Sequence, residues 1–260
     1  MARMIVVDRD GKEHEVEGKS GLKIMEILRE LDYGVAAICG GLCSCATCHI
    51  YIDPAWADRA IGWAEQSPDQ RALRVAAVRE VYEEAGILIA RDGSGASFCG
   101  DERAHDARDA VAKDDRAFLD LVGELDVSID LNALVVFARW ITPKMMPKRF
   151  DTWFYVAVAP ADQLAVCDGS ETVDAEWIAP KEALRLGEAR ERTIIFPTRM
   201  NLQLLAEASS SEDAVHRARA RELVTVEPQI TDRPEGRVLV LPPNAGYGDV
   251  VEPIGRALGG

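Results

Sequence analysis

The chain has 260 residues, of which 48% are hydrophobic and 28% are charged, and its formal net charge is −14 at pH 7. This composition is ordinary for a globular protein, and the length allows one large domain or two small ones. The negative charge argues against nucleic acid as a partner, because proteins that bind it usually present a basic face. The longest apolar run, residues 131–141, is too short to cross a membrane. No apolar signal-peptide stretch opens the sequence, so we expect a cytoplasmic protein with neither a nucleic-acid nor a membrane partner.

The first 55 residues contain the pattern of a small folded unit. Residues 4–7 and 14–17 are predicted to be strands, because Asp10 and Gly11 between them form a hairpin signal. Residues 21–31, "GLKIMEILREL", have apolar side chains at helical spacing and predict a helix. Residues 49–53, "HIYID", predict a further strand, which ends before Pro54.

Four of the six cysteines lie between the predicted helix and this last strand, in "CGGLCSCATCH", residues 39–49. Cys39, Cys45 and Cys48 form the spacing C-x5-C-x2-C. Clustered thiolates in an intracellular chain suit an iron–sulfur cluster or zinc better than structural disulfides. Three outcomes stay open from the residues alone: a cluster, adventitious zinc, or reduced cysteines without a metal.

Together with the following residues, "CATCHIYID", this loop resembles the cluster loop of vertebrate-type and bacterial [2Fe–2S] ferredoxins. The resemblance covers about residues 1–55, and it implies a partial β-grasp fold with a [2Fe–2S] cluster on Cys39, Cys45 and Cys48. Ferredoxins of this type take a fourth cysteine from a later segment, and no such segment is recognised here. Cys43 is the candidate for the fourth ligand. If the cluster forms, a redox partner is implied as well.

A second group of reactive side chains is predicted on a helix that includes residues 73–88 and ends at Gly86. At ~100° per residue, the carboxylates of Glu80, Glu83 and Glu84 share one face. The opposite face is predicted to be apolar and consists of Val75, Val78, Val81, Tyr82 and Ala85. Hard divalent cations prefer carboxylate oxygens, so the acidic face suits Mg²⁺, and Arg79 is one turn before Glu83. The alternative is an acidic helix face that only contacts solvent.

The string "REVYEEAGI", residues 79–87, resembles the second half of the Nudix box, R-E-U-x-E-E-x-G-U with U aliphatic. The later strings "PKRFDTWFYVA", "AEWIAPKEAL" and "FPTRMNLQLLAE" resemble the coenzyme-A-type branch of that family, which has a helical insert. Counting back from Arg79 places Glu65 where the box has its first glycine and Arg71 where it has its first glutamate. The strand and glycine-rich loop that usually precede the box are not recognised.

The resemblance implies Mg²⁺ or Mn²⁺ as cofactor. Glu80, Glu83 and Glu84 would be metal ligands, Glu83 or Glu84 the base, and Arg79 the residue that orients them. Glu171 or Glu176 would be a distal carboxylate beside a predicted strand at residues 172–178, "TVDAEWI". The implied substrate is a nucleoside-diphosphate-linked small molecule of the coenzyme A or acyl-CoA type.

The remaining pattern predicts the fold. Residues 106–124 form a helical insert, residues 134–141 and 152–158 are strands, residues 180–191 and 198–208 are helices, and "RVLVLPP" near the end contains a strand. Strands alternating with helices predict an α/β protein with a mixed sheet covered on both faces. We therefore expect a ferredoxin-like unit at residues 1–55 and a Nudix-type α/β/α sandwich at residues 56–260.

Three functions follow from these patterns. The preferred one is a metal-dependent hydrolase of diphosphate linkages, because its resemblance claims most of the chain. The alternatives are a [2Fe–2S] electron carrier and a non-catalytic fusion of two remnants. The four histidines have no ligand spacing and are interpreted as structural or surface residues, and residues 209–211, "SSS", as a loop.

Overall fold

The computed structural model describes residues 2–7, 12–18, 54–146, 149–169, 172–234 and 236–257. At the N-terminus, β1 (Ala2–Val7) pairs antiparallel with β2 (Glu13–Gly18), and Ala2 stands opposite Gly18. This pairing confirms the predicted hairpin. The predicted helix at 21–31, the cysteine loop and the predicted strand at 49–53 lie outside the described residues.

The central element is helix α2 (Pro68–Ala85), which follows a short 3-10 helix, η1 (Pro54–Asp58), and β3 (Ala60–Ile61). It begins five residues before the predicted span, because the Ser67 side chain accepts a hydrogen bond from the Gln70 amide and Pro68 occupies the first turn. It ends as predicted: Gly86 has φ 71°, the left-handed conformation that glycine adopts readily.

A first core forms on one side of α2. The sheet β3-β5-β4 contains β4 (Ala90–Arg91) and β5 (Ser128–Asp130), with β3 parallel and β4 antiparallel to β5. The fully buried side chains of Val78, Tyr82, Phe118 and Ile129 pack together here. Burial of side chains of this size is the main stabilising contribution to such a layer.

The helical insert begins four residues before the predicted span of 106–124 and is three short helices rather than one: α3 (Glu102–Asp106), α4 (Arg108–Val111) and α5 (Asp115–Glu124). Asp101 caps α3 and Asp114 caps α5, each by accepting a hydrogen bond from the backbone amide two residues later, whereas α4 has no side-chain cap. Val111, Phe118 and Val122 are buried against α2 and β5.

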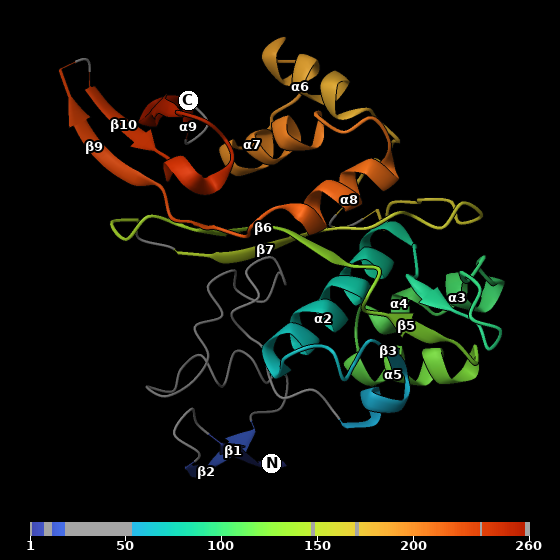
Figure 1. The fold of residues 1–260 in the computed structure, drawn as a ribbon. Helices are drawn as coiled ribbons and strands as arrows, with labels where there is room; N and C mark the ends of the chain where they lie inside the picture. The colour runs from blue at the N-terminus through green and yellow to red at the C-terminus, as the bar shows by residue number, and fades with distance from the viewer. Residues whose placement is uncertain are drawn as a thin grey trace.

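A second sheet has the order β7-β6-β8, from β6 (Val135–Ile141), β7 (Asp151–Val156) and β8 (Thr225–Val226). β7 is antiparallel and β8 parallel to β6. Side chains of β7 alternate between two cores, since Tyr155 packs with the α2 core while Phe154 and Val156 pack with the other one. Figure 1 shows α2 on one side of this sheet and α8 (Ser211–Ala220) on the other. The predicted mixed sheet with helices on both faces is thereby confirmed.

The rest of the chain covers the second core. Helices α6 (Pro180–Glu188) and α7 (Phe196–Leu205) match predicted helices, and β10 (Gly236–Val240) is the predicted late strand. The unpredicted elements are α8, β9 (Gln229–Arg233), η2 (Pro243–Ala245), β11 (Val251–Pro253) and α9 (Ile254–Ala257). Residues 209–211 are not simply a loop, because the Ser210 side chain caps α8 by accepting from the Asp213 amide.

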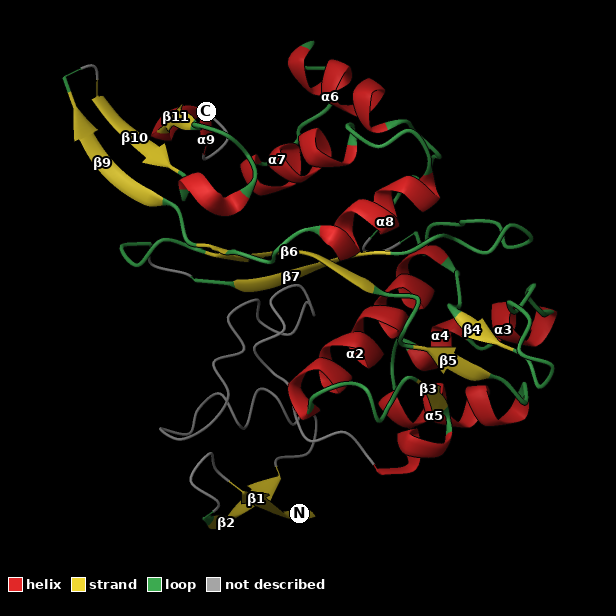
Figure 2. Cartoon of the chain, viewed as in Figure 1, coloured by secondary structure: helices red, strands yellow, loops and turns green. Residues whose placement is uncertain are grey.

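One predicted strand is wrong. Residues 172–178 form neither strand nor helix, and the described residues between β7 and α6 are irregular (Figure 2). Val173 and Trp177 are 82% and 71% exposed, so the alternating pattern of this segment does not face a core. None of the helices in the described part of the chain combines the length and apolar character needed to cross a membrane.

Candidate active site on helix α2

The three glutamates predicted as functional lie on the last two turns of α2 and are all partly buried. Arg79 forms an ion pair through Nε with Oε1 of Glu83, and the two side chains are only 22% and 16% exposed. On the other side of the helix, Val78 and Tyr82 are buried as predicted. Val81 is a correction to the predicted apolar face, because it is 37% exposed. At ~100° per residue it lies at the edge of the acidic face rather than opposite it.

The glutamates do not by themselves form a complete metal shell. In the residues that the structure describes, no three His, Cys, Asp or Glu side chains are arranged to hold a metal ion. The donor set still fits Mg²⁺ or Mn²⁺, because Mg²⁺ is usually bound by one or two carboxylates together with water and substrate phosphate oxygens. Carboxylates one helical turn apart, as Glu80 and Glu84 are, can supply that number.

The C-terminal end of α2 is held by four different donors. A helix leaves its last four carbonyls without an intrahelical partner beyond the cap. Here the carbonyl of Tyr82 accepts from the Gly86 amide at 2.9 Å and that of Ala85 from the Val166 amide at 2.9 Å. The carbonyl of Glu83 accepts from Arg108 Nε at 2.7 Å, and that of Glu84 lies 2.9 Å from the Thr172 hydroxyl. The last turn therefore has a partner for every carbonyl.

The helical insert makes two of the contacts with α2. Arg108, on α4, is 8% exposed and supplies the cation at the negative end of the helix. The Tyr82 hydroxyl donates to the carbonyl of Ala104 on α3. Burial raises the pKa of Tyr82 to about 12, so this hydroxyl stays protonated and able to donate at ordinary pH.

The irregular segment after β7 makes the other contacts. The buried Gln163 side chain accepts from the Leu88 amide at 2.8 Å and donates to the carbonyls of Leu88 and Phe98. The Thr172 hydroxyl is also 2.6 Å from Asp168 Oδ1, which accepts from the Thr172 amide at 2.7 Å. This segment contains no regular structure, but its hydrogen bonds fix it against the end of α2.

The predicted distal carboxylates are not brought to this place by any contact described. Glu171 lies outside the described residues. Glu176 forms an ion pair with Arg192 at 2.8 Å, and both side chains are more than 40% exposed. A distal catalytic carboxylate therefore stays a prediction.

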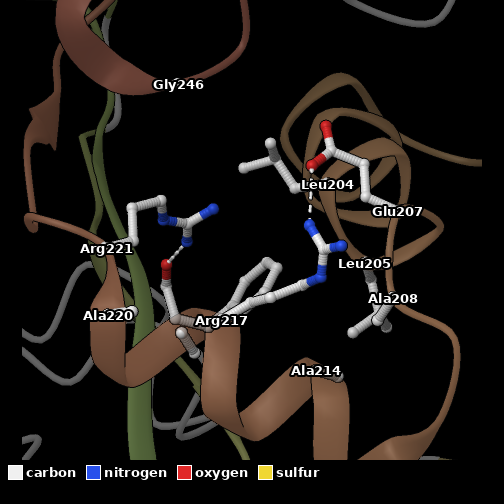
Figure 3. A pocket seen from close by; sticks show the side chains of 11 residues that line it. Leu204, Leu205, Glu207, Ala208, Ala214, Arg217, Ala220, Arg221 and Gly246 are labelled. Carbon is white, nitrogen blue, oxygen red and sulfur yellow. Dashed lines mark hydrogen bonds and ion pairs between the residues drawn. The ribbon is translucent and has the colours of Figure 1, made fainter.

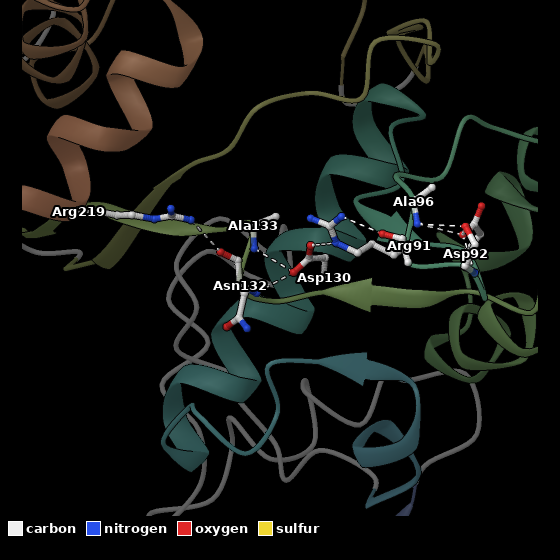
Figure 4. A network of polar contacts seen from close by, with 9 residues as sticks. Arg91, Asp92, Ala96, Asp130, Asn132, Ala133 and Arg219 are labelled. Atoms are coloured by element: carbon white, nitrogen blue, oxygen red, sulfur yellow. Dashed lines mark hydrogen bonds and ion pairs between the residues drawn. The ribbon is translucent and has the colours of Figure 1, made fainter.

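The middle of α2 is anchored to the turn after β5. Arg74 is 8% exposed and donates from Nη1 to the carbonyls of Leu131 and Leu134. Figure 4 shows the same turn bound to other elements: Asp130 forms an ion pair with Arg91 at 2.6 Å, and the Asn132 carbonyl accepts from Arg219 of α8 at 3.4 Å. This turn ties β4, β5, α8 and α2 together.

The start of α2, where the sequence departs from the Nudix pattern, is bound to the turn before it. Arg71, where the box has a glutamate, donates to the Trp63 carbonyl at 2.7 Å, and its guanidinium lies 5.0 Å from the Trp63 ring centre. Gly62 has φ 80°, and an added Cβ would lie 2.7 Å from Asn132 Nδ2. This requirement for glycine was not recognised from the sequence, because Asn132 is 70 residues away in the chain.

A separate cavity of about 300 Å³ is lined by residues of α7 and α8 (Figure 3), and Figure 1 shows these helices on the opposite side of the β6–β7 sheet from α2. Phe137, Leu204 and Leu205 form its apolar lining, and Arg217 and Arg221 lie at its edge. Arg217 pairs with Asp213 at 3.1 Å, and Arg221 donates to the Phe137 carbonyl. Both arginines are thus engaged within the protein.

The cysteines predicted as cluster ligands, Cys39, Cys45 and Cys48, and the candidate Cys43 lie outside the described residues. Cys99 and Cys167 are described, and neither forms a disulfide. The side chains of His105 and His216 are exposed, which agrees with their interpretation as surface residues.

Comparison with known proteins gives the family. The family model of the NUDT19 Nudix domain matches residues 40–204. The human acyl-coenzyme A diphosphatase NUDT19 is 30% identical over 194 residues, covering 69% of this chain and 52% of that protein. Ferredoxin CarAc from Sphingomonas sp is 47% identical over 58 residues, covering 22% of this chain and 52% of the ferredoxin, and matches the N-terminal region. The chain thus spans about half the length of each of these two relatives.

A solved structure agrees with the fold. The crystal structure of the NUDIX hydrolase from Alicyclobacillus acidocaldarius has a TM-score of 0.53 and 27% sequence identity, covering 63% of this chain and 76% of that one. The predicted α/β fold class is confirmed by this similarity and by the mixed sheets. The match to the family model extends over more than half of the sequence, so the chain belongs to the Nudix family, in the group of the NUDT19 Nudix domain.

Proposed function

We propose that the protein hydrolyses a diphosphate linkage with the help of Mg²⁺ or Mn²⁺ at the acidic face of α2. The observation that supports this most is the placement of Glu80, Glu83 and Glu84 on the fixed C-terminal turns of α2 in a chain of the Nudix family. Glu80, Glu83 and Glu84 would hold the cation. When bound, the cation supplies charge neutralisation of the diphosphate oxygens and makes a coordinated water more acidic.

The side chains around the cation would have the remaining roles in catalysis. The ion pair with Arg79 fixes the direction of the Glu83 carboxylate and offsets part of the repulsion among the three carboxylates. Glu84 has its backbone held by Thr172, so its side chain starts from a fixed position. Either Glu83 or Glu84 would accept the proton of the attacking water, which requires a carboxylate within hydrogen-bond reach.

The substrate class we propose is a nucleoside-diphosphate-linked small molecule of the coenzyme A or acyl-CoA type. Support comes from the human relative, whose name states that it is an acyl-coenzyme A diphosphatase. We place the enzyme in the cytoplasm, because Cys99 and Cys167 are free thiols and such thiols are kept reduced there.

A panel of diphosphate compounds tests this proposal. Purified protein is incubated with coenzyme A, acyl-CoA, nucleotide sugars and dinucleotides, with Mg²⁺, with Mn²⁺ or with a chelator. We expect metal-dependent release of a phosphate ester from coenzyme A compounds. If none of the panel is hydrolysed with either metal while the protein is folded, the proposal is wrong.

A second function is proposed for the N-terminal region, on the similarity to ferredoxin CarAc. Cys39, Cys45 and Cys48 would hold a [2Fe–2S] cluster and make residues 1–55 an electron-transfer unit ahead of a hydrolase at residues 56–260. The match to the Nudix family begins at residue 40, so it overlaps the proposed ferredoxin-like unit over residues 40–55. A brown protein with iron and sulfide would support the electron carrier, and a colourless one that hydrolyses diphosphates would support the hydrolase alone.

A further inference from the structure

We propose that Arg108 and Thr172 are positioning residues that hold the last turn of α2 so that Glu83 and Glu84 can bind the metal ion. This inference rests on the proposed function and adds to it two residues outside the Nudix box. It also gives a role to the two segments that carry them, the helical insert and the irregular segment after β7.

The first step is electrostatic. The C-terminal end of a helix carries a partial negative charge, and carboxylates there are unfavourable. α2 has Glu80, Glu83 and Glu84 near this end and no basic residue in its last turn. Arg79 of the preceding turn pairs with the Glu83 carboxylate, but the cation that bonds a carbonyl of the last turn comes from another element. Arg108 of α4 supplies it, with Nε 2.7 Å from the Glu83 carbonyl.

The second step concerns what Arg108 does for stability. Its side chain is 8% exposed, and its Nη2 has no hydrogen-bond partner among the described residues. A buried donor without a partner is destabilising, so the guanidinium carries a cost at Nη2. Its Nε offsets that cost by bonding the Glu83 carbonyl and by placing a positive charge at the negative end of α2.

The third step is the contact of Thr172 with Glu84. The Thr172 hydroxyl has one proton and two acceptors within reach, the Glu84 carbonyl at 2.9 Å and Asp168 Oδ1 at 2.6 Å. Asp168 also accepts from the Thr172 amide, which closes the turn and keeps the hydroxyl facing α2. The backbone of one proposed ligand is thus held by a side chain 88 positions later in the chain.

Loss of these contacts should change how well the proposed ligands bind the metal ion. Residues that orient metal ligands without touching the metal typically change metal affinity by ~10 to 100-fold when they are replaced. Loss of Arg108 or Thr172 should loosen the last turn of α2, weaken metal binding and speed hydrogen exchange at the Gly86 amide, which closes that turn.

The experiment uses the whole chain and three variants, Arg108→Met, Arg108→Lys and Thr172→Val, with Arg74→Met as matched control. Arg74 is as buried as Arg108 and also bonds backbone carbonyls, but it lies in the middle of α2, away from the last turn. Mn²⁺ affinity is measured by electron paramagnetic resonance, amide exchange by mass spectrometry, and the unfolding temperature by circular dichroism.

We expect Arg108→Met to weaken Mn²⁺ binding by at least ~10-fold, Arg108→Lys to restore part of it, and Thr172→Val to weaken it by at least ~3-fold. Exchange at Gly86 should accelerate in Arg108→Met and Thr172→Val. Arg74→Met should lower the unfolding temperature yet leave Mn²⁺ affinity within ~2-fold. If Arg108→Met does not fold, the lysine and valine variants decide the question.

Two results would overturn the inference in distinguishable ways. If the unmodified protein binds Mn²⁺ and the Arg108 and Thr172 variants bind it as well as the Arg74→Met control does, positioning is wrong and the proposed function stands. If the unmodified protein does not bind Mn²⁺, the proposed function fails first, and the inference fails with it.

Discussion

Among single residues, Glu83 and Glu84 are neighbours that are held in different ways. The Glu83 carboxylate is paired with Arg79 and its carbonyl with Arg108, whereas the Glu84 carbonyl faces Thr172. Both side chains are partly buried but line no core, so changing a carboxylate to an amide of the same shape leaves the packing intact. An effect of either change on activity can therefore be assigned to the lost charge rather than to altered packing.

Glu83→Gln and Glu84→Gln should each lower the rate of diphosphate hydrolysis by at least ~100-fold, because a lost ligand charge removes stabilisation of the transition state. Rates are measured on the best substrate of the panel, and circular dichroism verifies the fold. Glu188→Gln, at an exposed position at the end of α6, is the control and should retain full activity. Unchanged rates in both site variants would exclude the assignment.

Gly62 offers a test of the turn that precedes α2. Its φ of 80° disfavours any side chain, and an added Cβ would also press on Asn132. Gly95 has nearly the same φ, 84°, but nothing lies within 4 Å of its added Cβ. We expect Gly95→Ala to lower the free energy of unfolding by about 1 kcal/mol and Gly62→Ala to lower it by clearly more. Chemical denaturation measures both, and equal effects would show that Asn132 adjusts without cost.

At the scale of elements, the sequence predicts well whatever depends on local spacing. The presence and the end of α2 follow from apolar periodicity and Gly86, and the β6, β7, α6 and α7 positions follow from local patterns in the same way. Residues 172–178 mislead because their alternation resembles a strand, yet Thr172 bonds to α2 and Trp177 faces solvent. Alternation alone does not reveal whether a partner strand is present.

The same distinction between local and distant contacts applies to the candidate site. The acidic face and the pair of Arg79 and Glu83 are local, four residues apart, and are predicted from the sequence. The partners of the helix end are not, because Arg108 is 25 positions from Glu83 and Gln163 is 75 positions from Leu88. These residues come together only in the folded chain, and a single sequence does not reveal which distant residues will be in contact.

The interface between α2 and β7 predicts an alkaline transition. Burial raises the pKa of Tyr155 to about 12 from 10.0, while its hydroxyl donates to Gln70 and its ring packs on Arg74. Because the folded pKa is the higher one, the stabilisation is complete below pH 10 and is lost as the pH rises from 10 towards 12.

Tyr155→Phe keeps the ring over Arg74 and removes the titrating group, so its stability should fall less steeply across that range than that of the unmodified protein. Urea unfolding at pH 9, 10 and 11 measures the slope. Identical slopes for the two proteins would show that Tyr155 ionises in the folded state as readily as in the unfolded one.

At the scale of the whole molecule, the chain combines a Nudix domain with a region similar to a ferredoxin. The three cysteines of the predicted cluster loop need a fourth ligand, because [2Fe–2S] clusters of this type use four. Among the described cysteines, Cys99 is exposed and Cys167 is partly exposed. Recruiting Cys43 instead would require the loop to leave the geometry of its family.

We therefore expect protein purified in air to contain far less than two irons per chain, and a cluster rebuilt without oxygen to be lost on exposure to air. Iron and sulfide assays with visible absorption spectra measure this. A stable cluster near stoichiometry would contradict the expectation, and serine variants of Cys43, Cys99 and Cys167 would then identify the fourth ligand.

The distances along the chain between the end of α2 and its partners also bear on synthesis at the ribosome. When α2 leaves the exit tunnel, the carbonyls of Glu83, Glu84 and Ala85 have only water as partners. Arg108 emerges 25 residues after Glu83, and Thr172 only 88 residues after Glu84. At ~5 to 20 residues per second, several seconds separate the formation of the helix from the completion of its last turn. The acidic end of α2 thus reaches its final geometry well after the helix itself has formed in the growing chain.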